Sequence, residues 1–198
     1  LNKDAQIQFN RVTASGWEVL LANAGDADIY GAEVEYVLRP VEGLELRGGL
    51  GITSFEYSEV INPWTGVDEK DTRHLEFAPK YNWNISGRYI FPSLGFATAS
   101  ARVDYVGYSD IGFNTSIPDD YVVGQSPYGL VHLRLALDDI AAGALPGAIG
   151  VAFVGKNVTD TSYRVGGYRA NVAGFGSYSA NVYGDPRFFG GEISYRWG

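Results

Sequence analysis

Few side chains in this sequence are placed to do metal chemistry. The two histidines, His74 and His132, lie far apart in the chain, and the sequence contains no cysteine. No histidine or thiolate pair therefore stands at the spacing that protein metal ligands usually show. The carboxylates of residues 68–71 are oxygen ligands of the kind that Ca²⁺ uses, but we interpret this run as a solvated loop. The sequence predicts neither a metal nor a cofactor.

Motifs for catalysis are also missing from the sequence. Several serines are present, but none lies in the G-x-S-x-G pattern that positions a serine nucleophile. The glycine-containing segments 166–167 and 174–176 fall inside a long connection, whereas a phosphate-binding loop lies between a strand and a helix. We therefore expect a protein that is not an enzyme.

Residues suited to binding concentrate in the long connections between the expected strands. Aromatic and arginine side chains on loops are groups that a ligand-capturing surface uses, because loops on a rigid scaffold carry many binding residues. The alternative is that these side chains only pack the loops against one another. The candidate ligand-contact residues are Trp64, Arg73, His74, Tyr121, Tyr163, Tyr168 and Arg169.

The elements that must hold these loops are extended strands. The clearest one covers residues 187–197, where Phe189 and Tyr195 alternate with Glu192 and Arg196. Because successive side chains point to opposite faces of a strand, one face of this segment is apolar and the other is charged. A single strand of this kind suits a soluble sheet or a membrane barrel, so the rest of the chain must decide between them.

The same alternation recurs along the chain and predicts eight strands. They cover residues 4–10, 29–38, 44–57, 80–91, 96–108, 128–137, 148–158 and 187–197. Most approach the ~9–11 residues that a tilted strand needs to cross a bilayer. The connections are in turn long, short, long, short, long, medium and long, which is typical of a chain with all its short turns on one side of a membrane. We predict an all-β fold, an antiparallel transmembrane β-barrel.

The two faces of these strands have different expected surroundings. Charges of both signs on the polar faces suit a wet barrel lumen, and tyrosine and tryptophan near strand ends suit the girdles at the membrane interfaces. The expected lumen-facing residues are Glu33, Glu35, Arg47, Arg88, Arg102, Asp104, His132, Arg134, Lys156, Glu192 and Arg196. The expected girdle residues are Tyr57, Tyr81, Trp83, Tyr108, Tyr128, Phe188, Tyr195 and Trp197.

The composition supports a barrel and argues against other classes. The 198 residues include 26 glycines and 14 tyrosines, a combination that suits an all-β protein. A mean hydropathy of −0.09 is far too polar for a bundle of membrane helices, and Pro146 interrupts the longest nearly apolar run at residues 140–155. The net charge of −8, with no basic stripe, argues against nucleic-acid binding.

Four short segments carry motifs that recur in one family. Residues 23–35, NAGDADIYGAEVE, fit the pattern N-A-G-x-A-x-x-x-G-x-E-x-E, and residues 77–83, FAPKYNW, contain an A-P strand opening. Residues 155–163, GKNVTDTSY, are similar to N-L-x-D-x-x-Y, and residues 183–190, YGDPRFFG, to G-x-P-R-x-x-G. In this order, and over essentially the whole chain, the segments resemble the C-terminal end of the barrel of TonB-dependent receptors.

The resemblance implies a place in a larger protein. Barrels of this family have about 22 strands, so residues 1–198 would be a C-terminal portion without the plug domain. The family takes up scarce nutrients such as iron-siderophores, cobalamin or glycans across the bacterial outer membrane, with energy coupled through TonB. This chain would supply barrel wall and extracellular loops. Its implied partners are outer-membrane lipid, the missing plug and N-terminal strands, the TonB complex acting through the plug, and a small-molecule nutrient.

Two other architectures remain open from the residues alone. A small self-closed barrel of eight strands, with a structural or adhesive role, predicts that the first expected strand pairs with the last. A soluble β-sandwich that serves as a binding module predicts that the apolar strand faces point to a protein core.

Overall fold

The computed structural model describes residues 2–13, 16–113, 123–143, 146–172 and 176–197. The elements are β1 (Asn2–Thr13), β2 (Gly16–Val41), β3 (Leu44–Val60), η1 (Lys70–Thr72), β4 (Tyr81–Ile90), β5 (Thr98–Tyr108), β6 (Tyr128–Ala141), β7 (Ala148–Lys156), β8 (Arg164–Val172), β9 (Gly176–Tyr183) and β10 (Phe188–Arg196). In this part of the chain, no helix is long and apolar enough to cross a membrane.

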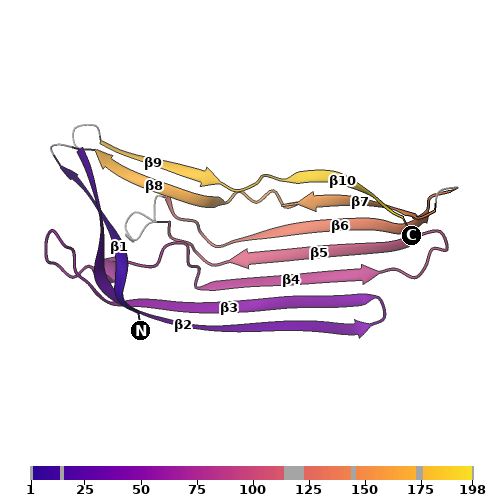
Figure 1. Ribbon diagram of the computed structural model, residues 1–198, viewed down its shortest axis with the longest axis horizontal. Coiled ribbons are helices and arrows are strands. Elements are labelled where there is room, and N and C mark those ends of the chain that lie inside the picture. Colours follow the sequence, from indigo (N-terminus) through magenta and orange to yellow (C-terminus); the bar gives the residue numbers. More distant parts are fainter. Residues whose placement is uncertain (1, 14–15, 114–122, 144–145, 173–175, 198) are drawn as a thin grey trace.

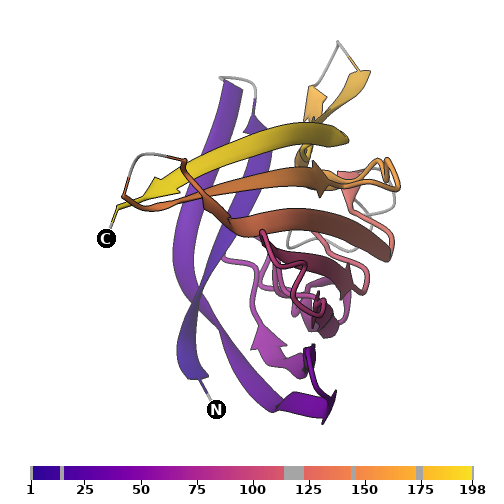
Figure 2. The same ribbon diagram turned by 90° about the vertical axis from the view of Figure 1, so that its right-hand side faces the viewer.

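Eight of the strands form one curved antiparallel sheet. Its order is β1-β2-β3-β4-β5-β6-β7-β10, while β8 and β9 pair only with each other (Figures 1 and 2). The predicted all-β, antiparallel fold is confirmed. Strands β1 and β10 lie at opposite edges of the sheet and, within the described residues, do not pair. The pairing that a self-closed barrel of eight strands requires is therefore not formed.

The connections separate by length to the two ends of the sheet. The turns β2–β3, β4–β5 and β6–β7 lie at one end, and the long segments 61–80, 109–127 and 157–187 lie at the other (Figure 1). This arrangement follows from an up-and-down antiparallel order, in which every second connection returns to the same end. The predicted alternation of short and long connections thus places all candidate binding loops together.

Two predicted connections are strands instead. Between the first two expected strands, the sequence suggests a connection with only a short extended piece near residues 17–22, but β2 already begins at Gly16 and pairs with β1 through Thr13↔Gly16 and Val12↔Trp17. Residues 164–183 were also expected to be a connection, but they form the β8–β9 hairpin. Glycine and aspartate suggest loops in sequence, yet backbone pairing with a neighbouring strand overrides a weak local preference.

The first half of β2 bends out of the sheet together with β1, and both form an arm at the loop end (Figure 1). Register shifts lie on β1 near Ala5 and on β2 between Asp26 and Ala27, and such bulges bend strands. A Cβ at Gly25 would lie 2.7 Å from Ile7 Cδ1. Glycine is therefore needed where the two strands of the arm approach each other.

Strand register divides the side chains of the sheet into an apolar face and a charged face. Residues directly opposite each other in antiparallel strands point to the same face. One row of such pairs crosses seven strands without a charge: Leu38, Leu46, Gly87, Val103, Leu133, Gly155 and Phe189. Leu38 is 54% exposed and Ile193 is 85% exposed on this apolar face. No second layer of the described structure covers it, as a soluble sandwich would require.

The register also sorts the expected girdle aromatics, and half of them are on the wrong face. Tyr81, Trp83 and Tyr195 lie on the apolar face. The prediction is wrong for the residues that register places on the charged face: Tyr57, Tyr108, Tyr128 and Phe188. Closeness to a strand end says nothing about which way a side chain points, because a shift of one residue reverses the face.

Aromatic rings on the apolar face lie over glycines of the neighbouring strand. Trp83 is directly opposite Gly107, and Phe189 is directly opposite Gly155. A Cβ at Gly107 would overlap the indole ring of Trp83, and a Cβ at Gly155 would lie 3.1 Å from the Phe189 ring. These glycines leave space for a ring to cover the backbone, which is a known way to stabilise glycine in strands.

The arm encloses a small hydrophobic core at the loop end of the charged face. Its buried members are Ile7, Phe9, Ala27, Tyr57 and Val60. This core joins β1, β2 and β3, so it fixes the base of the loop that follows Val60.

We expect Gly107→Ala to destabilise the sheet by about 1–3 kcal/mol, because the new methyl group displaces the Trp83 ring. Gly87→Ala is the matched control, since its Cβ would meet Leu46 Cδ2 at an ordinary 3.5 Å. Urea unfolding in detergent micelles, followed by tryptophan fluorescence, measures both changes. Equal free energies of unfolding for the two variants would contradict the packing described for Trp83.

We expect the loop after β3 to open in acid because of Asp68. Hydrogen bonds from the Val60 and Lys70 N–H groups, at 2.9 and 3.1 Å, lower the pKa of this carboxyl. The carboxylate therefore stabilises the loop above the pKa of the unfolded chain, and the contribution is lost as pH falls through the lowered pKa. Amide hydrogen exchange at Val60 and Lys70, corrected for intrinsic rates, should show this loss of protection.

The acid response should depend on this one carboxyl. Asp68→Asn should weaken protection at neutral pH and remove its acid dependence, whereas Asp71→Asn in the same loop should leave both unchanged. The same acid dependence in wild type and Asp68→Asn would show that another group controls the loop.

Candidate ligand-binding site

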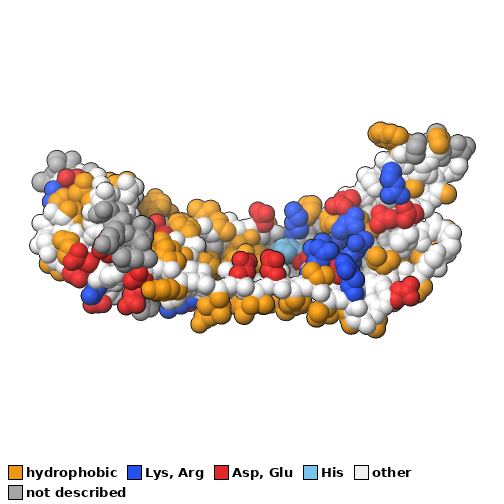
Figure 3. Space-filling view, turned by 60° about the horizontal axis from the view of Figure 1, so that its bottom comes forward, with side chains coloured by type: hydrophobic (Ala, Val, Ile, Leu, Met, Phe, Trp, Pro, Cys, Tyr) orange, Lys and Arg blue, Asp and Glu red, His pale blue; other side chains and the backbone are white. Residues whose placement is uncertain are grey.

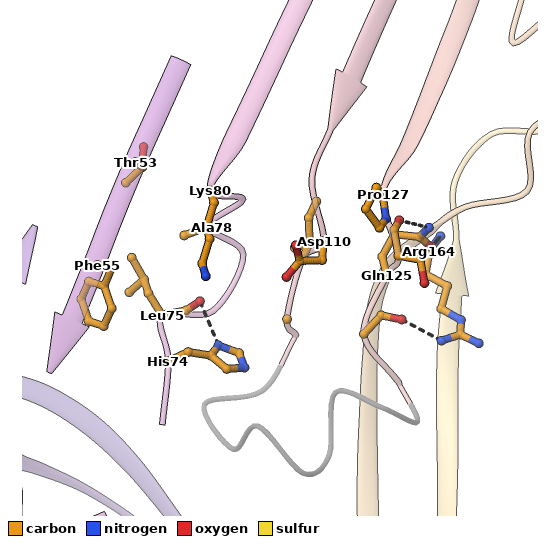
Figure 4. A pocket seen from close by; sticks show the side chains of 14 residues that line it. Thr53, Phe55, His74, Leu75, Ala78, Lys80, Asp110, Gln125, Pro127 and Arg164 are labelled. Atoms are coloured by element: carbon orange, nitrogen blue, oxygen red, sulfur yellow. Dashed lines mark hydrogen bonds between the residues drawn. The ribbon is translucent and has the colours of Figure 1, made fainter. Parts of the chain in front are cut away.

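A cavity opens among the long connections at the loop end of the sheet. Its volume is about 700 Å³, and it is lined by residues of β3, of the segments 61–80 and 109–127, and by Arg164 at the start of β8. Figure 4 shows the side chains of Lys80, Asp110, Gln125 and Arg164 around this space. A volume of this size is in the range of small-molecule sites.

Backbone hydrogen bonds hold the walls of this cavity together. Phe77 N–H donates to the Gly112 carbonyl at 2.9 Å, which ties the segment 61–80 to the segment 109–127. Ile111 and Gln125 exchange two N–H···O bonds of 2.9 Å, which closes the second segment on itself. Main-chain hydrogen bonds therefore position the walls of this cavity.

Strand β8 is fastened to the same wall through its first residue. The N–H of Arg164 donates to Gln125 Oε1 at 2.6 Å, and its Nη1 donates to the Gly124 carbonyl at 2.7 Å. Gln125 Nε2 in turn donates to the Ser126 carbonyl at 2.7 Å. Arg164 thus both carries a positive charge at the cavity and links the β8–β9 hairpin to the loop after β5.

The charged groups at the cavity favour an anionic or carbonyl-rich ligand. Lys80 and Arg164 bring two cationic groups, against the single carboxylate of Asp110. His74 also lines the cavity, and its Nδ1 lies 3.2 Å from the Leu75 carbonyl. Among the residues that the structure describes, no group of three His, Cys, Asp or Glu side chains could hold a metal ion. This arrangement can bind and orient a ligand through hydrogen bonds and charge.

Two of the predicted loop residues pack the arm instead of lining the cavity. Trp64 meets the ring of Phe9 edge-on at 6.4 Å, and the Arg11 guanidinium lies 4.4 Å from the Trp64 ring. Arg73 lies 5.1 Å from the Phe9 ring and forms an ion pair of 2.6 Å with Glu69. These contacts agree with the alternative that such residues pack the loops. Among the candidate ligand-contact residues that the structure describes, His74 lines the cavity.

Tyrosines of the segment 157–187 make ring contacts with other tyrosines. Tyr163 stacks on Tyr128 at 4.8 Å, and Tyr128 stacks on Tyr108 at 5.3 Å, so three rings form one column. Tyr168 meets Tyr178 edge-on at 6.0 Å across the β8–β9 hairpin. Arg169 lies on β8 of this hairpin. Tyr121 lies outside the described residues.

All the residues predicted to face a lumen share the charged face of the sheet. Register connects Glu33 and Glu35 on β2 with Arg47 on β3, and the connection continues strand by strand to Glu192 and Arg196 on β10. Figure 3 shows Lys and Arg side chains gathered in one patch, with acidic side chains beside it. Whether this face borders a lumen remains a prediction.

Sequence reasoning missed four residues at the cavity: Lys80, Asp110, Gln125 and Arg164. The available signal was their position along three consecutive predicted strands: Lys80 begins the strand 80–91, Asp110 follows the strand 96–108, and Gln125 precedes the strand 128–137. Ends of neighbouring antiparallel strands meet at one edge of a sheet. Polar residues there could have been proposed as neighbours without any knowledge of the loops.

No family model matches this chain. Two solved structures share its fold: the ferric yersiniabactin uptake receptor FyuA from Yersinia pestis, at 20% identity and a TM-score of 0.64, and BauA, the ferric preacinetobactin receptor from Acinetobacter baumannii, at 14% identity and a TM-score of 0.62. The likeness covers 88% of this chain and 24% of FyuA, and 96% of this chain and 26% of BauA. The chain thus spans about a quarter of each receptor, and its curved antiparallel sheet has the fold of that part.

Proposed function

We propose that this chain forms part of the wall of a β-barrel receptor in the outer membrane of a Gram-negative bacterium. The observation that carries the proposal is a single sheet whose exposed apolar face is crossed by a row of uncharged residues over seven strands, while the opposite face is rich in charges. Lipid suits the first face and a water-filled or plugged lumen suits the second. The resemblance to TonB-dependent receptors and the fold shared with two receptors support the same reading.

The dimensions of the apolar face agree with a membrane. On β2, apolar-face side chains run from Tyr30 to Leu38. This corresponds to roughly 26 Å of extended chain at ~3.3 Å per residue, or about 20 Å of height for a strand tilted by ~40°. The apolar band of outer-membrane barrels is about 25 Å tall. Lipid is therefore the partner we propose for this face.

The two edges of the sheet require further strands. In the described part of the chain, residues 28–41 of β2 pair only with β3, because β1 pairs with residues 16–27 in the arm, and β10 pairs only with β7. The outer edges of this part of β2 and of β10 therefore have no partner strand. Unpaired backbone groups cannot face hydrocarbon, so membrane barrels are closed. We propose that additional strands of a longer protein close this sheet, and that a plug domain of the same protein provides the coupling to TonB.

The cavity at the loop end supports capture of a small nutrient. Lys80 and Arg164 suit a ligand with anionic oxygens. FyuA and BauA are by name receptors for ferric complexes, so among the nutrients of the family we propose an iron-siderophore for this chain. Cobalamin and glycans are the other outcomes that a binding assay would distinguish.

We expect the native protein to be several times heavier than the 21.5 kDa of this chain, because the sheet needs partner strands to close. Intact mass spectrometry of the protein extracted by detergent from isolated outer membranes measures this. A native mass near 21.5 kDa would contradict the receptor proposal, as would recovery of the protein in the detergent-free fraction.

We expect Lys80→Gln in the native receptor to weaken binding of an anionic ferric complex by about 10-fold, the effect of one charge-assisted hydrogen bond. Lys70→Gln is the matched control, because Lys70 lies on the same loop and outside the cavity. Tryptophan-fluorescence titrations with ferric yersiniabactin and ferric preacinetobactin measure the affinities. Equal affinities of the two variants, or binding of neither complex by the folded receptor, would contradict the iron-siderophore assignment.

A further inference from the structure

The two cationic residues of the cavity come from segments that lie far apart in the chain. Lys80 ends the segment 61–80, and Arg164 is the first residue of β8. An anion can contact both groups at once only if their separation is fixed, because charge-assisted hydrogen bonds depend on distance and direction. The contacts that connect the two segments therefore decide how the cavity can bind.

The first two of these contacts are made by the main chain alone. Phe77 N–H donates to the Gly112 carbonyl at 2.9 Å, three residues before Lys80. Ile111 and Gln125 then exchange two N–H···O bonds of 2.9 Å. Together they connect the segment of Lys80, through the segment 109–127, to the main chain of Gln125.

The third contact, which reaches Arg164, is made by the side chain of Gln125. Its Oε1 accepts a hydrogen bond from Arg164 N–H at 2.6 Å, and its Nε2 donates to the Ser126 carbonyl at 2.7 Å (Figure 4). An N–H group needs an acceptor and a carbonyl needs a donor, so these partners fix the orientation of the amide. Both polar atoms of Gln125 thus have partners within the protein, and its effect on a ligand would pass through Arg164.

The start of β8 depends on this contact because its own hairpin pairs irregularly there. The register of β8–β9 shifts just after Arg164, and such a shift interrupts the hydrogen-bond ladder. The neighbouring contacts hold other atoms: Arg164 Nη1 donates to the Gly124 carbonyl at 2.7 Å, and a Cβ at Gly167 would lie 2.9 Å from the oxygen of the buried Val123. Gln125 is the residue whose side chain fixes the main chain of Arg164 itself.

We propose that Gln125 is a positioning residue of the cavity. It holds Arg164 at a set separation from Lys80, so that an anion with two or more oxyanion groups can contact both cations. This inference rests on the receptor proposal and deepens it, because it names a polyvalent anion as the class of ligand and a neutral residue as the one that makes this selection. It requires that Gln125 influences affinity only while Arg164 is present.

Amide hydrogen exchange of the native receptor in detergent tests the contact without any ligand. Gln125→Met keeps the length of the side chain and removes the acceptor, so it should lower the protection of Arg164 N–H. Gln125→Asn keeps the amide on a side chain that is too short, and it should have the same effect. The matched control is Gln6→Met, the same substitution at an exposed position of β1, which should leave this protection unchanged. Unchanged protection in both Gln125 variants would overturn the proposal.

Isothermal titration calorimetry of the same receptor with citrate and acetate, at an ionic strength of about 0.1 M, tests the effect on binding. Citrate should bind more tightly than the monovalent acetate. Gln125→Met should weaken citrate binding by about 3- to 10-fold, the effect of one neutral hydrogen bond, and Arg164→Gln by about 10-fold. The double variant should bind citrate no more weakly than Arg164→Gln alone, because residues that act through one contact have non-additive effects.

The double variant separates a positioning role from a general loss of structure. Additive losses would show that Gln125 acts without Arg164 and would overturn the proposal. Citrate binding no tighter than acetate binding, or equal losses of citrate affinity in Gln125→Met and Gln6→Met, would overturn it as well. Citrate probes the two cations without assuming an iron-siderophore, which the titrations with ferric complexes test. The two proposals can therefore fail separately.

Discussion

The rest of the structure depends on the backbone hydrogen bonds that join each strand of the eight-stranded sheet to its neighbours, in the order from β1 to β10. These bonds pair the N–H and C=O groups of neighbouring strands, and in the described residues they leave open the outer edges of β1, of residues 28–41 of β2 and of β10. In a low-dielectric surrounding, each unpaired group costs several kcal/mol. The paired part of the sheet can therefore face an apolar surrounding, whereas its open edges need further hydrogen-bond partners there.

The same ladder creates two chemically different surfaces from alternating residues. Register aligns apolar residues across seven strands on one face, and it aligns Arg88, Arg102 and Arg134 on the other. Packing on the apolar face uses rings over glycine, as for Trp83 over Gly107. The charged face instead carries arginine, lysine, aspartate and glutamate side chains, so one backbone arrangement produces two chemically different surfaces.

The loop end combines a packed arm with an open cavity. Trp64 and Arg73 are used in the arm, where they contact Phe9. The cavity lies beside it, with walls held by main-chain hydrogen bonds and with Arg164 fastened to Gln125. Lys80 and Arg164 line this space of about 700 Å³, which is a volume that small ligands occupy in proteins.

The sequence by itself determined the antiparallel all-β fold and seven of the eight sheet strands to within a few residues. It also determined that the residues expected to face a lumen share one face of the sheet, because the alternation of side chains along a strand is visible without coordinates. It did not determine that residues 16–28 extend β2, that 164–183 form a hairpin, or that Tyr108 and Tyr128 point to the charged face. Only the tertiary structure decided these, since pairing partners and register arise from residues far apart in the chain. The hydrogen bond between Arg164 and Gln125 likewise joins residues far apart in the chain, so only the tertiary structure reveals it.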